Sequence, residues 1–132
     1  MGTIVCAVDD SPEAEEALRA ALRLSRDAGL RLVVAHVAKG TTVTGPAEQL
    51  GRHLLDQLLA RQGLNGRVDR RVEVGERANE LARVAAEEAA SMIVLGSRSR
   101  RWWRRLPASR LTSDLAATAA CPVMVVPPAR ER

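Results

Sequence analysis

Five short strand-like segments alternate with four helix-like patterns along the chain, and this alternation limits the possible folds more than any other feature. The strand candidates are 3-TIVCAV-8, 31-RLVVAHV-37, 68-VDRRVEV-74, 92-MIVL-95 and 123-VMVV-126. Several of them are apolar at consecutive positions, which is typical of strands covered on both faces of a parallel sheet. The alternation therefore predicts an α/β three-layer sandwich, in which right-handed crossovers place helices on both faces of the sheet.

The first helix has the clearest boundaries. Ser11 can cap it, Pro12 fits its first turn, and Gly29 can end it in a left-handed conformation. The pattern continues without a linker or an internal repeat, so residues 1–132 are predicted to form a single domain.

The other three helices are predicted from the spacing of their apolar residues. The second begins near Pro46 and is expected to bury four leucines, Leu50, Leu54, Leu55 and Leu58. The third is expected to place inward Ala78, Leu81, Ala82, Ala85, Ala86 and Ala89. The fourth runs from about Ser109 to Ala119 and stops before Pro122.

Ligands of such sheets bind at the carboxyl ends of the strands, at the point where the strand order reverses. Two loops at such ends are unusual in sequence: 8-VDDSP-12 after the first strand, and 96-GSRSRRWWRRLPASRLTSD-114 after the fourth. The second loop holds six arginines, which are Arg98, Arg100, Arg101, Arg104, Arg105 and Arg110. Without them the chain has 14 basic against 16 acidic residues, so its net charge of +4 arises in this one loop.

Trp102 and Trp103 are the only aromatic residues of the phenylalanine, tryptophan and tyrosine class, and they lie among these arginines. Three interpretations remain open. One tryptophan can pack against the rim of the sheet or in a dimer contact. The pair can stack on nucleic-acid bases while the arginines hold phosphates, or it can cover a nucleotide base as a lid.

The remaining composition points to a cytoplasmic protein. Cys6 and Cys121 lie far apart inside or beside apolar runs, without a CxxC pair, which favours two buried thiols over a zinc or redox site. A strand-like segment begins at Thr3 without a basic leader, and no apolar run reaches the length of a membrane span. We therefore expect no membrane association and no metal.

The two loops and the segments around them resemble the universal stress protein family. The resemblance rests on 4-IVCAVDDSPEAEEAL-18, 33-VVAHV-37, 74-VGERANELARVAAEEAASMIVLGSRS-99 and 121-CPVMVVP-127, which cover nearly the whole chain. It implies a Rossmann-like fold of the adenine nucleotide alpha hydrolase-like type, with a five-stranded parallel sheet ordered 3-2-1-4-5. It also implies a stress-response role, ATP binding in some members, and a homodimer formed through the last strand, residues Val123, Met124, Val125 and Val126.

Nucleotide-binding members of this family are similar in carrying G-x2-G-x9-G-[ST] after the fourth strand. In this chain the pattern falls on Gly96, Ser99, Ser109 and Arg110, so only its first glycine is present. A phosphate nest often needs positive φ, which costs a residue with a Cβ about 1–2 kcal/mol. The two serines therefore predict weakened or lost ATP binding. The positions with implied nucleotide contacts in this segment are Gly96, Ser97, Ser99, Ser109, Arg110 and Leu111.

The resemblance also implies contacts from the first two strands. Asp9 matches the aspartate that contacts ribose, Ala7 lines the same crevice, and Val37 matches the position whose backbone meets adenine. The alternative for Asp9 is that it only forms the turn and cap that lead into the first helix. Both interpretations remain open, and one residue can serve both ends.

No catalytic pattern is present in the sequence. There is neither a G-x4-G-K-[ST] run nor a G-x-S-x-G elbow. His36 lies within an apolar run, where a buried or crevice-edge histidine with a hydrogen-bond partner is expected, and His53 lies on a polar helix face. We therefore predict that the chain is not an enzyme, with a weak ATPase activity left open.

Three functional hypotheses follow. The chain is a stress-response binding or signalling module with weakened or lost ATP binding. Alternatively, it is a sensor that keeps ATP or another adenine nucleotide in the crevice between the loops after the first and fourth strands. A further alternative is an interaction protein that docks nucleic acid or acidic partners through residues 98–110.

Overall fold

The computed structural model describes residues 2–9, 11–38, 45–64, 68–96 and 110–127. These residues form five strands and four helices in strict alternation. The strands are β1 (Thr3–Ala7), β2 (Arg31–Ala38), β3 (Asp69–Val74), β4 (Met92–Gly96) and β5 (Val123–Val126). The helices are α1 (Pro12–Ala28), α2 (Pro46–Arg61), α3 (Arg77–Glu87) and α4 (Arg110–Thr118).

The strands form one parallel sheet in the order β3-β2-β1-β4-β5, as predicted. Ile4 in β1 pairs with Leu32 of β2 on one side and with Met92 of β4 on the other. The chain thus winds outward from β1 in both directions, and the strand order reverses between β1 and β4. The carboxyl ends of these two strands are therefore where a ligand site is expected.

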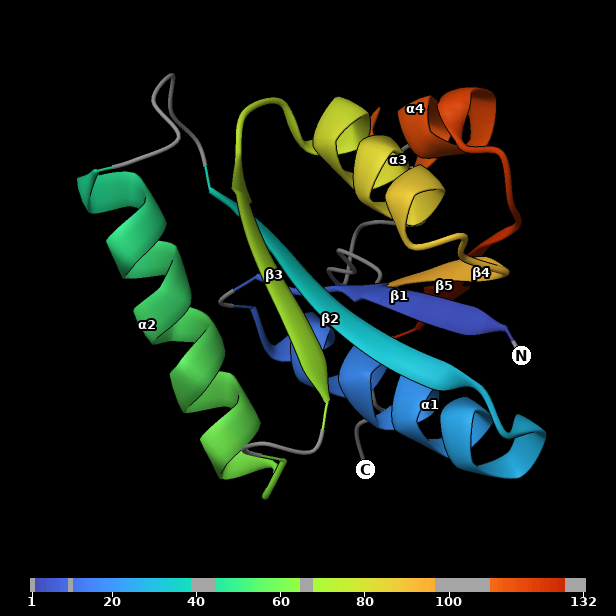
Figure 1. Cartoon of the computed structure of the whole chain (residues 1–132), viewed down its shortest axis with the longest axis horizontal. Helices are drawn as coiled ribbons and strands as arrows, with labels where there is room; N and C mark the ends of the chain where they lie inside the picture. The colour runs from blue at the N-terminus through green and yellow to red at the C-terminus, as the bar shows by residue number, and fades with distance from the viewer. Residues whose placement is uncertain (1, 10, 39–44, 65–67, 97–109, 128–132) are drawn as a thin grey trace.

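Two apolar cores lie on the two faces of the sheet. Helices α1 and α2 cover one face and α3 and α4 cover the other (Figure 1). Successive strand residues alternate between the two cores, so that Ile4 and Cys6 belong to the first and Val5 to the second. Because both faces are covered, the central strands carry apolar residues at consecutive positions, such as Ile4, Val5 and Cys6, and this produced the continuous apolar runs in the sequence.

Helix α1 begins and ends as its sequence predicts. The Ser11 hydroxyl accepts a hydrogen bond from the backbone N–H of Ala14 at 3.3 Å, and Pro12 occupies the first turn. Gly29 ends the helix with φ of 66°, a conformation in which glycine avoids the strain that a Cβ causes.

The prediction for the buried face of α2 was wrong at Leu50, whose side chain is 69% exposed. The buried residues of this helix are Gly51, Leu55, Leu58 and Leu59. A Cβ at Gly51 would lie 3.0 Å from carbon atoms of both His36 and Val72, so the glycine lets the helix approach the sheet closely. This approach turns the helix so that Leu50 points to solvent.

Helix α3 also differs from its prediction. Val84 is fully buried, whereas Ala86 and Ala89 are exposed. Alanine spacing alone did not separate the two sides of a helix that carries alanine on both.

Candidate functional site

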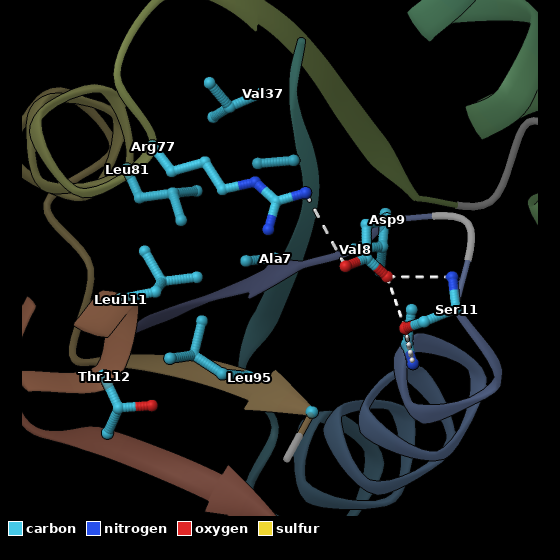
Figure 2. A pocket seen from close by; sticks show the side chains of 13 residues that line it. Ala7, Val8, Asp9, Ser11, Val37, Arg77, Leu81, Leu95, Leu111 and Thr112 are labelled. Carbon is cyan, nitrogen blue, oxygen red and sulfur yellow. Dashed lines mark hydrogen bonds and ion pairs between the residues drawn. The ribbon is translucent and has the colours of Figure 1, made fainter. Parts of the chain in front are cut away.

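A pocket lies at the carboxyl ends of β1, β2 and β4, between the amino ends of α3 and α4 (Figure 2). The space between its lining atoms, together with the open solvent at its mouth, is about 540 Å³. Among the residues that the structure describes, its polar side chains are those of Asp9, Ser11, Arg77 and Thr112. The other lining residues are Ala7, Val8, Ala14, Ala35, Val37, Leu81, Leu95, Gly96 and Leu111.

The structure brings together five of the predicted site residues in this pocket: Ala7, Asp9, Val37, Gly96 and Leu111. They come from β1, β2, β4 and α4, which are far apart in the sequence. Ser97, Ser99 and Ser109, the side chain of Arg110, and the pair Trp102 and Trp103 lie outside the described residues. Nucleotide contact by any of these residues stays a prediction.

Asp9 forms the turn that leads into α1. Its Oδ1 atom accepts a hydrogen bond from the Ser11 backbone N–H at 2.9 Å and another from the Ser11 hydroxyl. Its Oδ2 atom lies 3.7 Å from Nη2 of Arg77, on the pocket side (Figure 2). One carboxylate oxygen therefore holds the local turn, while the other faces the pocket, so the two interpretations of Asp9 are compatible.

Gly96 has a structural reason to be glycine that does not involve a ligand. A Cβ at this position would lie 2.4 Å from the carbonyl oxygen of Glu13 and 2.7 Å from its carbonyl carbon. The end of β4 thus packs directly on the backbone of the first turn of α1. The one glycine of the motif that this chain retains is required by packing, and so its presence is not by itself a sign of phosphate binding.

Sequence reasoning missed Arg77 and Thr112 as pocket residues. Arg77 is the first residue of α3, directly after the turn that follows β3. Thr112 lies in the first turn of α4. The signal that could have found Arg77 is its place after a strand, because the carboxyl ends of all parallel strands meet at one edge of the sheet.

His36 lies outside the pocket lining and is buried, as predicted. Its Nδ1 atom lies 2.9 Å from the backbone carbonyl oxygen of Val8. Because a carbonyl only accepts, Nδ1 carries the proton in this contact. The contact ties the end of β1 to β2 beside the pocket, and it gives His36 a structural role.

The two cysteines differ in burial. Burial raises the pKa of the Cys6 thiol to about 12, so this thiol is unreactive at neutral pH. Cys121 is only half-buried, contrary to the prediction of two buried thiols, and its pKa is raised by partial burial. Within the described part of the chain, no group of three or more His, Cys, Asp or Glu residues could hold a metal ion. No helix in that part is long and apolar enough to cross a membrane.

The sequence matches the family model described as the universal stress protein family over residues 1–127. No curated protein sequence matches the chain significantly. A universal stress protein family structure from Burkholderia pseudomallei is 32% identical, with a TM-score of 0.69, over 97% of this chain and 96% of that one. A universal stress protein from Archaeoglobus fulgidus is 25% identical, with a TM-score of 0.75, over 96% of this chain and 98% of that one.

Several matching structures contain adenine nucleotides. A universal stress protein from Archaeoglobus fulgidus in complex with dAMP is 23% identical, with a TM-score of 0.70, over 96% of this chain and 98% of that one. Further matches contain cAMP or AMP. At 23% identity or less these matches show the shared fold alone.

Proposed function

Because this chain belongs to the universal stress protein family, we propose that it binds an adenine nucleotide in the pocket between β1, β2, β4, α3 and α4. The observation that supports this most is the convergence of Ala7, Asp9, Val37, Gly96 and Leu111 on one pocket at the point where the strand order reverses. Related folds that contain dAMP, cAMP or AMP are consistent with the same ligand class.

The pocket chemistry suits a nucleoside. Apolar side chains such as Val37, Leu81 and Leu111 offer a dry slot for a planar base. The Oδ2 atom of Asp9 accepts hydrogen bonds and faces the pocket, where ribose hydroxyls can donate to it. A 5′-phosphate would then point toward Gly96 and Thr112, near the amino end of α4.

We expect the hold on a triphosphate to be weak, because serines replace the second and third glycines of the motif. The affinities for AMP, ADP and ATP should then lie within about tenfold of one another. In this proposal the protein is a non-enzymatic, cytoplasmic stress-response module. It signals by whether or not a nucleotide is bound in its pocket.

A thermal-shift titration with adenosine, AMP and ATP tests this function. A ligand that binds only the folded state stabilises it by about 2.7 kcal/mol at 100 times its Kd, which raises the Tm by several degrees. Asp9→Asn should weaken adenosine binding about tenfold, since it removes a charged acceptor while its amide oxygen can still accept from Ser11. Asp56→Asn, outside the pocket, should leave binding unchanged. No Tm shift with any of the three ligands at millimolar concentration would contradict the proposal.

We also propose that two copies of the chain pair through β5. This strand lies at one edge of the sheet and consists only of Val and Met residues, and its Val125 side chain is 38% exposed. The opposite edge strand, β3, instead carries charged residues, namely Asp69, Arg70, Arg71 and Glu73. Charged residues discourage pairing at an exposed edge, so β5 is the edge suited to a partner.

A further inference from the structure

Arg77 differs from the neighbouring arginines in how its guanidinium is bonded. Arg71 reaches Glu73 at 2.9 Å, Glu87 at 2.7 Å and Glu88 at 3.2 Å, and Arg83 reaches Glu73 at 2.7 Å and Glu87 at 2.8 Å. Within the described residues, Arg77 makes no hydrogen bond, and its one ion pair is the long 3.7 Å contact with Asp9. Its N–H donors therefore remain available on the wall of the pocket.

The guanidinium of Arg77 is the cationic group in the described part of the pocket lining. Its side chain is only 25% exposed, so water screens its charge incompletely. The amino end of α3 does not supply an alternative anion site. The Glu76 carboxylate already accepts from the backbone N–H groups of Ala78 at 3.1 Å and Asn79 at 3.0 Å.

In the view of Figure 2, Ala7 and Leu95 lie between the side chains of Arg77 and Thr112. A phosphate directed toward Gly96 and Thr112 would therefore lie away from Arg77. An anion that reaches Arg77 must instead be attached on the side of the ribose that faces Asp9.

We propose that Arg77 binds a phosphate group carried on the 2′ or 3′ oxygen of the ribose, so that the pocket prefers adenine nucleotides phosphorylated there. This rests on the nucleotide-binding function proposed above and names its ligand class. A guanidinium binds phosphate through two parallel charge-assisted hydrogen bonds, for which the unused donors of Arg77 are suited. The chemistry is shared by 2′-phosphates, 3′-phosphates and 3′,5′-cyclic phosphates.

Asp9 makes the proposal sharply testable, because its carboxylate acts in opposite directions on the two ligand types. The carboxylate accepts from a free ribose hydroxyl but repels a phosphate attached at the same edge. Neutralising Asp9 should therefore weaken adenosine binding and strengthen the binding of a ribose-phosphorylated nucleotide. Because Asp9 also pairs with Arg77 at 3.7 Å, the contact between Arg77 and the phosphate is tested by variants of Arg77 itself.

The experiment is isothermal titration of the full chain with adenosine, 5′-AMP, 2′-AMP, 3′-AMP and 3′,5′-cAMP. In the wild type, at least one of the last three should bind about tenfold or more tightly than adenosine, and the one that does identifies the source of the phosphate. Arg77→Gln should reduce this advantage to about threefold or less while adenosine binding stays within about threefold. Arg77→Lys should retain part of the affinity advantage over adenosine, and Arg83→Gln on the same helix should retain the whole advantage.

The outcomes separate this inference from the function on which it rests. If adenosine and 5′-AMP bind but phosphorylation at the 2′ or 3′ oxygen gives no advantage, the role of Arg77 is wrong and nucleotide binding stands. The same conclusion follows if Arg77→Gln keeps the advantage and its thermal melt shows that it is folded. If none of the five ligands binds, the nucleotide-binding function fails and the inference fails with it.

Discussion

The end of β4 meets the first turn of α1 at Gly96, where an added Cβ would lie 2.4 Å from the carbonyl oxygen of Glu13. Both partners in this contact are backbone, so a larger residue cannot be accommodated by a change of rotamer. Gly96 therefore lines the pocket and at the same position lets β4 pack on α1.

Gly96→Ala should lower the free energy of unfolding by about 3 kcal/mol, because one of the two backbone segments must move. The matched control is Gly29→Ala. Nothing lies within 4 Å of an added Cβ there, and only its φ of 66° opposes the substitution. That control should lose about 1 kcal/mol. Urea denaturation of both variants measures the difference, and equal losses would show that the contact at Gly96 is not limiting.

At the scale of the element, three of the helix ends can be compared directly. Helices α1 and α2 are followed by glycines at positive φ, Gly29 and Gly63. Helix α3 ends with the same pattern of two backbone hydrogen bonds as α2. The N–H of Ala89 donates to the carbonyl oxygen of Ala86, and the N–H of Ala90 donates to that of Ala85. The left-handed residue at this end is Ala89, with φ of 51°. The end of α3 is therefore strained where the other two are not.

Ala89→Gly should raise the free energy of unfolding by about 0.5–1 kcal/mol, since the relief of the strained φ exceeds the entropy that glycine adds to the unfolded chain. Ala86→Gly is the control, because Ala86 is an exposed residue inside the same helix. There the substitution should lower the free energy of unfolding by about 1 kcal/mol. Chemical denaturation followed by circular dichroism gives both values, and the prediction fails if the two variants shift stability in the same direction.

The elements also show which features the sequence could predict. Strands buried on both faces have consecutive apolar residues in the sequence. The predicted ends of β1, β2 and β4 therefore lie within a residue or two of the observed ends. The orientation of α2 was not predictable from its leucines, because it depends on the close approach of Gly51 to His36 and Val72. Such a contact joins residues of three elements and leaves no periodic signal.

At the scale of the whole molecule, the two edges of the sheet differ in chemistry. The β3 edge is occupied by an ion-pair network in which Arg71 and Arg83 share Glu73 and Glu87. The β5 edge is apolar and partly exposed. The dimer proposed above would therefore be closed and two-fold, because the charged β3 edge does not suit the pairing that would extend it into a continuous sheet.

Val125→Lys should convert such a dimer to a monomer, because the new charge would be buried in the contact between the two β5 strands. Size-exclusion chromatography with light scattering measures the change as a halving of the mass. Leu50→Lys replaces an exposed large apolar residue on α2, away from β5, and should leave the dimer intact. A wild-type chain with the mass of one copy would exclude pairing through β5.

The arrangement of the whole chain explains why some pocket residues could be predicted from the sequence and others could not. Asp9 and Val37 were expected to share a site because each follows a strand, and the sheet order places them on one pocket. Arg77 reaches that pocket from α3, through a crossover from the edge strand β3, and its ion pair with Asp9 spans 68 positions of sequence. The sequence around a single arginine after a turn does not indicate such a distant partner, so the ion pair could be found only from the structure.

The tight contact at Gly96 has a consequence for how related sequences are compared. A lineage that no longer bound a nucleotide would still lose stability if it replaced this glycine. The presence of this glycine in a related sequence is therefore not evidence that the protein, or its ancestor, bound ATP.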